Sequence, residues 1–154
     1  MPQSYATALL HIVFSTKLRF KWLRPQDADT LKAYAFGILR NLGCRVLALE
    51  ILADHVHVLV DIGRCNSIAD VVRRLKMGTH HWLRRRSSFY SGFGWQRGYA
   101  AFSVSPSAKT RVIRYINNQP THHEMHLFED EYLLMLQNAE LVNHKSLIKD
   151  VFGS

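Results

Sequence analysis

Hydrophobic residues recur with two different periods along the chain, and these periods predict alternating strands and helices. Residues 5–15 are apolar and rich in β-branched side chains, which predicts a strand. Over residues 27–41 the apolar positions follow the spacing of an amphipathic helix, with Gly43 placed to end it. Residues 45–52 and 55–62 predict two further strands, and the two residues between them predict a tight hairpin.

The second half of the chain continues with a helix, a strand and a further helix. Ser67 is a typical N-cap for a second helix over residues 68–86. Residues 99–105 predict the fourth strand. The Ser-Pro pair at 105–106 is a typical helix start, so a third helix is expected to run to about Gln119, where the proline that follows ends it.

This order of elements, β-α-β-β-α-β, predicts an α+β fold of the ferredoxin-like or RRM-like type. Such folds have an antiparallel four-stranded sheet with two helices on one face and the other face open. We expect one domain over residues 1–154, because this length suits a single core. Its core would span about residues 5–121, with a tail over 122–154 that contains helical segments near 129–137 and 146–151.

The charge of the chain favours a polyanionic partner such as nucleic acid. Twenty Lys and Arg against twelve Asp and Glu give a formal net charge of +8. Nine of these cations form a candidate phosphate-binding track, for which a solvated helix face is the alternative. They are Lys17, Arg19, Lys21, Arg73, Arg74, Lys76, Arg84, Arg85 and Arg86. Nearby rings could stack on unpaired bases or pack in the core. They belong to His80, His81, Phe89, Tyr90 and Phe93.

The cysteines and the hydropathy pattern indicate an intracellular protein outside the membrane. Cys44 and Cys65 have neither the spacing of a metal pair nor the number that a disulfide scaffold needs, so we expect reduced thiols. No apolar run approaches the ~18 residues of a membrane span, and the N-terminus lacks the pattern of a signal peptide.

Two histidines on the predicted third strand are candidate metal ligands. Side chains alternate along a strand, so His55 and His57 share one face while Val56, Val58 and Val60 share the other. With the valines facing the helices, the two imidazoles could bind one divalent ion from the open face. The alternative is a pair of surface histidines with no ligand.

A tyrosine and a glutamine on the third predicted helix are further candidates. Tyr115 and Gln119 are four residues apart, which places them one turn apart on one side of a helix. Val112, Ile113 and Ile116 form an apolar stripe beside them, so the helix could pack on the sheet and offer a phenol and an amide to a site. The alternative is a half-buried ring and a solvated amide.

Four segments together resemble the TnpA-type, single-tyrosine HUH transposases of bacterial insertion sequences, the IS-two-hundred family. They are HIVFSTK at 11–17, DHVHVLV at 54–60, WQRGYAAFSVSPS at 95–107 and VIRYINNQ at 112–119. The resemblance spans most of the chain and is weaker after about Leu136. It implies that the histidine-hydrophobic-histidine motif is His55-Val56-His57, that Tyr115 is the nucleophile, and that Gln119 is the third metal ligand.

The resemblance also implies a reaction and its partners. Tyrosine, with a pKa of about 10, is a poor nucleophile, and bound Mg²⁺ or Mn²⁺ would compensate by offsetting charge on the scissile phosphate. Tyr115 would form a 5′-phosphotyrosine and leave a free 3′-OH, without a nucleotide cofactor. The expected substrate is single-stranded DNA with hairpins in a bacterial or archaeal cytoplasm. A homodimer is expected, whose tyrosine helix can complete the partner's histidine site.

Other functions compete with this one. Within the same chemistry, the chain could be a domesticated nuclease that acts on repeated hairpins, or a replication or conjugation nickase. An RRM-like module would bind nucleic acid on the open sheet face without catalysis. A small metallohydrolase would activate water with the metal, make Tyr115 incidental and form no covalent adduct.

Overall fold

The structure is a computed structural model, and it describes residues 4–122. A four-stranded antiparallel sheet forms its centre, in the order β2-β3-β1-β4. The strands are β1 (Leu9–Ser15), β2 (Arg45–Ile51), β3 (His55–Asp61) and β4 (Ala100–Ser103). The predicted ferredoxin-like arrangement is confirmed. The predicted tail lies outside the described residues from 123 onward.

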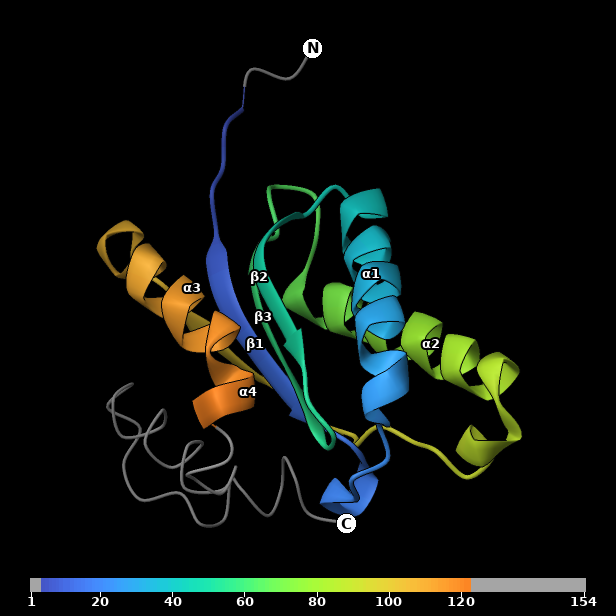
Figure 1. The fold of residues 1–154 in the computed structure, drawn as a ribbon. Helices are drawn as coiled ribbons and strands as arrows, with labels where there is room; N and C mark the ends of the chain where they lie inside the picture. The colour runs from blue at the N-terminus through green and yellow to red at the C-terminus, as the bar shows by residue number, and fades with distance from the viewer. Residues whose placement is uncertain (1–3, 123–154) are drawn as a thin grey trace.

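Two long helices cover one face of the sheet (Figure 1). They are α1 (Pro25–Asn41) and α2 (Ile68–Arg86). Alternate residues of the central strands, such as Phe14 and Val58, point into the core under these helices. The hydroxyl of Ser67 accepts a hydrogen bond from the backbone N–H of Asp70 at 3.1 Å, so the predicted N-cap of α2 is confirmed. Among the described residues, no helix is long and apolar enough to cross a membrane.

The first and fourth strands are shorter than predicted. β1 begins at Leu9, because residues 4–7 are exposed and lie outside its pairing with β3. β4 ends at Ser103, where its register with β1 ends at Leu10. Hydrophobicity alone does not show where a neighbouring strand stops, so the predicted strands extended past the paired region.

The predicted third helix is divided into three short elements. A 3₁₀ turn, η3 (Pro106–Ala108), precedes α3 (Lys109–Asn117), and α4 (Gln119–His122) follows after a break at Asn118. Pro120 explains the break, because a proline there cannot bond back to the carbonyl four residues earlier but fits the first turn of a new helix. Ser105 bonds to the Ser107 hydroxyl at 3.1 Å and does not cap the helix.

The second face of the sheet is covered, which corrects the expectation of an open face. α3 crosses it on the side opposite α1 and α2 (Figure 1). Ile116 of α3 is fully buried and packs on Leu59 of β3 and Ala48 of β2. The apolar stripe predicted beside Tyr115 therefore does pack on the sheet. The molecule has three layers, and its histidine face is an interior one.

One buried carboxylate joins the two long helices. Asp27, in the first turn of α1, is 4% exposed. It accepts hydrogen bonds from Arg24 Nε and Arg86 Nε, both at 3.0 Å, and from the Tyr90 hydroxyl at 2.5 Å. Burial by itself raises the pKa of Asp27, but the bonds from Tyr90, Arg86 and Arg24 outweigh it and leave the pKa below its ordinary value.

We predict that Asp27→Asn lowers the free energy of unfolding at neutral pH by about 1–3 kcal/mol, since it removes a charged acceptor from three donors. The lowered pKa means that the carboxylate stabilises the fold above the unfolded pKa of about 3.9, and that this stability is lost as the pH falls through the folded value. Urea unfolding between pH 7 and pH 3 measures both effects. A variant as stable as the wild type, with the same acid dependence, would contradict the prediction.

Candidate active site

Side chains alternate along β3, which places two histidines side by side on the face of the sheet that α3 covers. His55 and His57 are both fully buried, and their ring centroids are 5.0 Å apart. The valines between and after them face α1 and α2 instead. The alternative of two surface histidines is therefore wrong, and the pair lies in an interior polar cluster.

Each of the two rings is held through its Nδ1 atom. Nδ1 of His55 lies 2.7 Å from Oδ1 of Asp54, and Nδ1 of His57 lies 2.9 Å from Nε2 of His11. The Nε2 atoms of both rings are buried as well. A histidine that binds a metal through Nε2 generally has its Nδ1 fixed in this way by a carboxylate or another acceptor.

His11 and Asp54 are site residues that the sequence analysis did not single out, although both lie in segments that carry the resemblance. His11 lies opposite Leu59 in the β1–β3 register, which places it diagonally across from His57. Burial lowers the pKa of His11 from 6.5 to about 4, so its ring is neutral at neutral pH. The alternation of β1 could have placed His11 on one face, but only the pairing with β3 shows its neighbour.

Tyr115 reaches this cluster from α3. Its ring is partly buried and meets the ring of His57 edge-on, with centroids 5.8 Å apart, and that of His11 at 6.1 Å. The packing of Ile116 on Leu59 holds α3 against the sheet and so fixes the position of Tyr115. The structure thus brings the tyrosine and the two histidines together from separate elements.

Gln119 is the first residue of α4, and its side chain is fully buried. Both of its amide atoms, Oε1 and Nε2, are buried and have no hydrogen-bond partner among the described residues. The break at Asn118 means that Gln119 does not continue the helix of Tyr115, so the predicted i, i+4 pair on one helix is wrong. A solvated amide is excluded too. Burying an amide without a partner costs about 1–3 kcal/mol, which a ligand at this amide would offset.

The nitrogen and oxygen donors of these side chains are suited to bind a divalent cation with moderate affinity. Within residues 4–122 no three His, Cys, Asp or Glu side chains come together as a metal site. A metal bound to His55 and His57 would therefore take a further ligand from the amide oxygen of Gln119 or from the substrate. Neutral donors without a carboxylate suit Mn²⁺ better than Mg²⁺.

The predicted phosphate-binding track is divided between two places. Arg73, Arg74, Arg84, Arg85 and Arg86 are exposed on α2, in the helical layer. In the β1–α1 loop, Lys17 and Lys21 are exposed and Arg19 is half-buried. That loop follows Ser15, which pairs with His55, so it begins at the histidine end of the sheet.

Lys76 has a different environment from the other cations of the track. Its Nζ donates to the carbonyl oxygens of Gln96 at 2.9 Å and Gly98 at 2.7 Å, and it lies 5.3 Å from the ring centroid of Phe14. Burial lowers the pKa of Lys76 to about 8. Lys76 therefore supports the loop before β4 instead of extending the exposed arginine surface.

The aromatic residues near the end of α2 also differ in their exposure to solvent. Tyr90 and Phe93 are buried in the core, so of the two alternatives, base stacking and core packing, core packing holds for them. The ring of Phe89 is 45% exposed, with the guanidinium of Arg24 4.5 Å from its centroid. His81 is exposed and His80 is half-buried.

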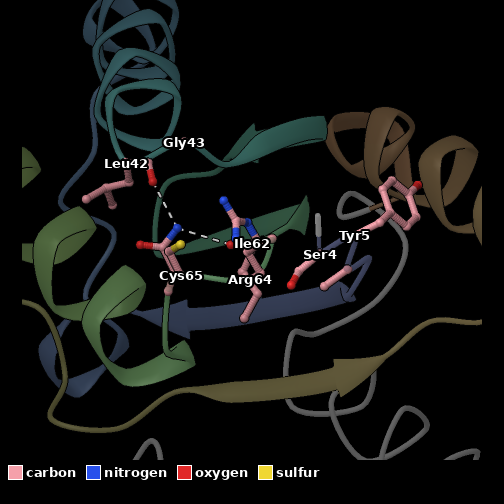
Figure 2. A pocket seen from close by; sticks show the side chains of 10 residues that line it. Ser4, Tyr5, Leu42, Gly43, Ile62, Arg64 and Cys65 are labelled. Carbon is pink, nitrogen blue, oxygen red and sulfur yellow. Dashed lines mark hydrogen bonds between the residues drawn. The ribbon is translucent and has the colours of Figure 1, made fainter. Parts of the chain in front are cut away.

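Figure 2 shows a surface depression of about 330 Å³. Its lining includes residues just after the end of β3, whereas His55 and His57 lie at the start of that strand. Residues from the end of α1 and from the segment after β3 line it, including Leu42, Arg64 and Cys65. Asn66 fixes its wall by donating to the carbonyl oxygens of Leu42 at 2.9 Å and Ile62 at 3.1 Å. None of its lining residues belongs to the histidine and tyrosine cluster.

Comparisons with known proteins show the family of the chain. Residues 4–119 match the family described as "Transposase IS200 like", and the chain belongs to that family. The chain is 26% identical to the ISDra2 transposase TnpA of Deinococcus radiodurans over 114 residues, covering 71% of this chain and 81% of the relative.

Two solved structures share the fold. A candidate transposase from Deinococcus radiodurans R1 matches with a TM-score of 0.59 and 26% identity, over 77% of this chain and 95% of the other. A REP-associated tyrosine transposase, bound to a REP hairpin, matches with a TM-score of 0.60 over 80% of this chain and 73% of the other. Its identity is 15%, so it shows the likeness of the fold alone.

We predict that Gln119→Leu raises the free energy of unfolding of the metal-free protein by about 1–3 kcal/mol, because it removes a buried amide that lacks hydrogen-bond partners within residues 4–122. Urea unfolding with a chelator measures this change. Mn²⁺ should then stabilise the wild type and have much less effect on the variant.

Gln96→Leu is the matched control, because the buried amide of Gln96 is hydrogen-bonded to Ser15 and Gly98 and its loss should lower stability. If Gln119→Leu lowered stability as much as Gln96→Leu does, the amide of Gln119 would have a structural partner and the prediction would fail.

Proposed function

We propose that this member of the transposase family cuts and rejoins single-stranded DNA by transesterification, with Tyr115 as the nucleophile. The observation that carries the proposal is the meeting of Tyr115, His57 and His11, whose rings lie 5.2 to 6.1 Å apart although they come from α3, β3 and β1. The ring centroid of His55 lies 5.0 Å from that of His57, and we propose that His55, His57 and Gln119 form the metal site.

In the proposed reaction, the oxygen of Tyr115 loses its proton and attacks the scissile phosphorus. The phosphotyrosine bond forms as the bond to the 3′ oxygen breaks, and that oxygen leaves as a 3′-OH after taking up a proton. A metal held by His55, His57 and Gln119 would supply positive charge to the phosphate. Attack by a second 3′-OH then rejoins DNA and restores the phenol. One phosphodiester replaces another, so no ATP is required.

Two features of the site support this chemistry over two alternatives: its burial under α3, and the contact of Tyr115 with His57. An RRM-like module uses an open sheet face to stack bases, but here α3 covers the face that carries the histidines. A metallohydrolase would not require a phenol, whereas Tyr115 lies edge-on against His57. A domesticated nuclease or nickase would share these residues and differ in its DNA substrate.

The proposed substrate is single-stranded DNA with hairpins, and the solved structure of the REP-associated relative is of a complex with such a hairpin. We further propose a cytoplasmic homodimer in which α3 of one copy can serve the histidines of the other. The exposed arginines of α2 and the lysines of the β1–α1 loop would hold the phosphates.

The central test is a covalent adduct. Purified protein, Mn²⁺ and labelled single-stranded DNA with its flanking genomic hairpins should give a protein-DNA band on a denaturing gel. Tyr115→Phe and a chelator should each abolish the band, while Tyr5→Phe, which changes a tyrosine 91% exposed on the N-terminal segment, should leave it unchanged. Cleavage without an adduct would favour a hydrolase, and binding without cleavage would favour a binding module.

The same gel tests the arrangement of the site between copies. If α3 serves the partner's histidines, a mixture of Tyr115→Phe and His57→Ala should recover some cleavage through mixed dimers. Recovery no greater than that of either variant alone would count against sites shared between copies, and leave assembly within one copy.

We predict that Arg74→Ala and Arg85→Ala each weaken binding to hairpin DNA. The loss of affinity for each variant should be about the same whatever the sequence of the DNA. Each loss of a phosphate contact should reduce the slope of log K against log salt by about 0.7 to 0.9. Fluorescence anisotropy between low and high salt measures the slope. Arg40→Ala removes an exposed arginine of α1 as the control. If the Arg74 and Arg85 variants keep the control's slope, the α2 surface does not contact DNA.

A further inference from the structure

We propose that His11 is a positioning residue, which holds His57 in the one tautomer that can bind a metal. The inference rests on the proposed function in one respect, that His57 serves as a ligand. The distinct claim is that a side chain on β1, outside the histidine-hydrophobic-histidine motif, selects the position of the proton on His57.

The contact between the rings of His11 and His57 determines which tautomers are possible. His11 is 6% exposed, its Nε2 lies 2.9 Å from Nδ1 of His57, and the two ring planes are inclined by 30°. A neutral imidazole has one nitrogen that donates and one that accepts. In a hydrogen bond between two such nitrogens, one ring therefore donates and the other accepts, and the choice decides where each ring carries its proton.

Only one of the two choices leaves His57 able to bind a cation. If Nδ1 of His57 donates to Nε2 of His11, the lone pair of His57 is on Nε2, the buried nitrogen of that ring. If His11 donates instead, the proton of His57 moves to Nε2 and blocks ligation. A hydrogen bond of this kind is how an outer residue fixes the tautomer of a ligand.

The two histidines of the motif differ in how firmly they are fixed. His55 faces the carboxylate of Asp54, which when ionised can only accept and so forces the proton onto Nδ1. His57 faces an imidazole, which can accept or donate. The ring of His11 also packs against Tyr115 and against Phe102, at centroid distances of 6.1 and 6.4 Å. One side chain therefore contacts both the proposed ligand His57 and the proposed nucleophile.

Two substitutions at His11 separate positioning from packing. His11→Gln keeps an acceptor, because an amide oxygen can take the bond from Nδ1–H of His57, while His11→Leu fills space without one. His81→Leu, which changes an exposed histidine of α2, is the control. Nitrogen-15 NMR of the metal-free protein reports which nitrogen of His57 carries the proton, and the EPR signal of free Mn²⁺ reports binding without DNA.

We expect the wild type to carry the His57 proton on Nδ1. His11→Leu should give a mixture of tautomers and bind Mn²⁺ about 10- to 100-fold more weakly, while His11→Gln should keep the tautomer and lose much less affinity. Urea unfolding establishes that each variant is folded. If His11→Leu does not fold, the wild-type tautomer and the Gln variant decide the question.

A wild-type His57 protonated on Nε2 would overturn the inference, as would a folded His11→Leu that binds Mn²⁺ like the wild type. Equal losses in the Gln and Leu variants would indicate packing alone and also overturn it. The NMR measurement requires neither DNA nor cleavage, so it should give the same result in Tyr115→Phe. An absent adduct with the expected tautomer would count against the proposed function and leave this inference standing.

Discussion

The antiparallel pairing of β1 with β3 positions both the core residues and the residues of the site. Its register places His11 diagonal to His57 and Ser15 opposite His55, and the same register directs Phe14 and Val58 to the other face. Because side chains alternate with a period of two, a slip of one residue would move the imidazoles under α1 and α2 and expose the core. Burial of the core residues and alignment of the histidines therefore require the same strand register.

The second helical layer buries polar groups that an isolated sheet would leave in water. Apolar contacts of Ile116 with Ala48 and Leu59 stabilise α3 on the sheet. The amide of Gln119, just after α3, is also buried, without a hydrogen-bond partner in the described chain. An amide, which carries no charge, costs less to bury than a carboxylate would, so the layer can close over it. The buried amide of Gln119, which is proposed to contact a metal, therefore lowers the free energy of unfolding.

The end of the sheet next to the histidines is held by a chain of contacts between two loops. The backbone N–H of Lys17 donates to the carbonyl of Gly94 at 2.8 Å, and Ser15 and Gln96 bond through backbone and side chain. Nζ of Lys76, on α2, donates to the carbonyl of Gln96 at 2.9 Å. These contacts connect α2 and β1 with the β1–α1 loop and the loop before β4. The position of the histidine pair therefore depends on residues far from it in sequence.

Local periodicity along the chain was enough to predict the order of the elements, the helical face of the core and the shared face of His55 and His57. The sequence also supplied the motifs that indicated the family. Three features followed from the folded structure alone: α3 closes the second face, Gln119 begins a separate helix, and His11 and Asp54 hold the histidine rings. These features depend on strand register and on packing between distant segments, which no period along the chain records.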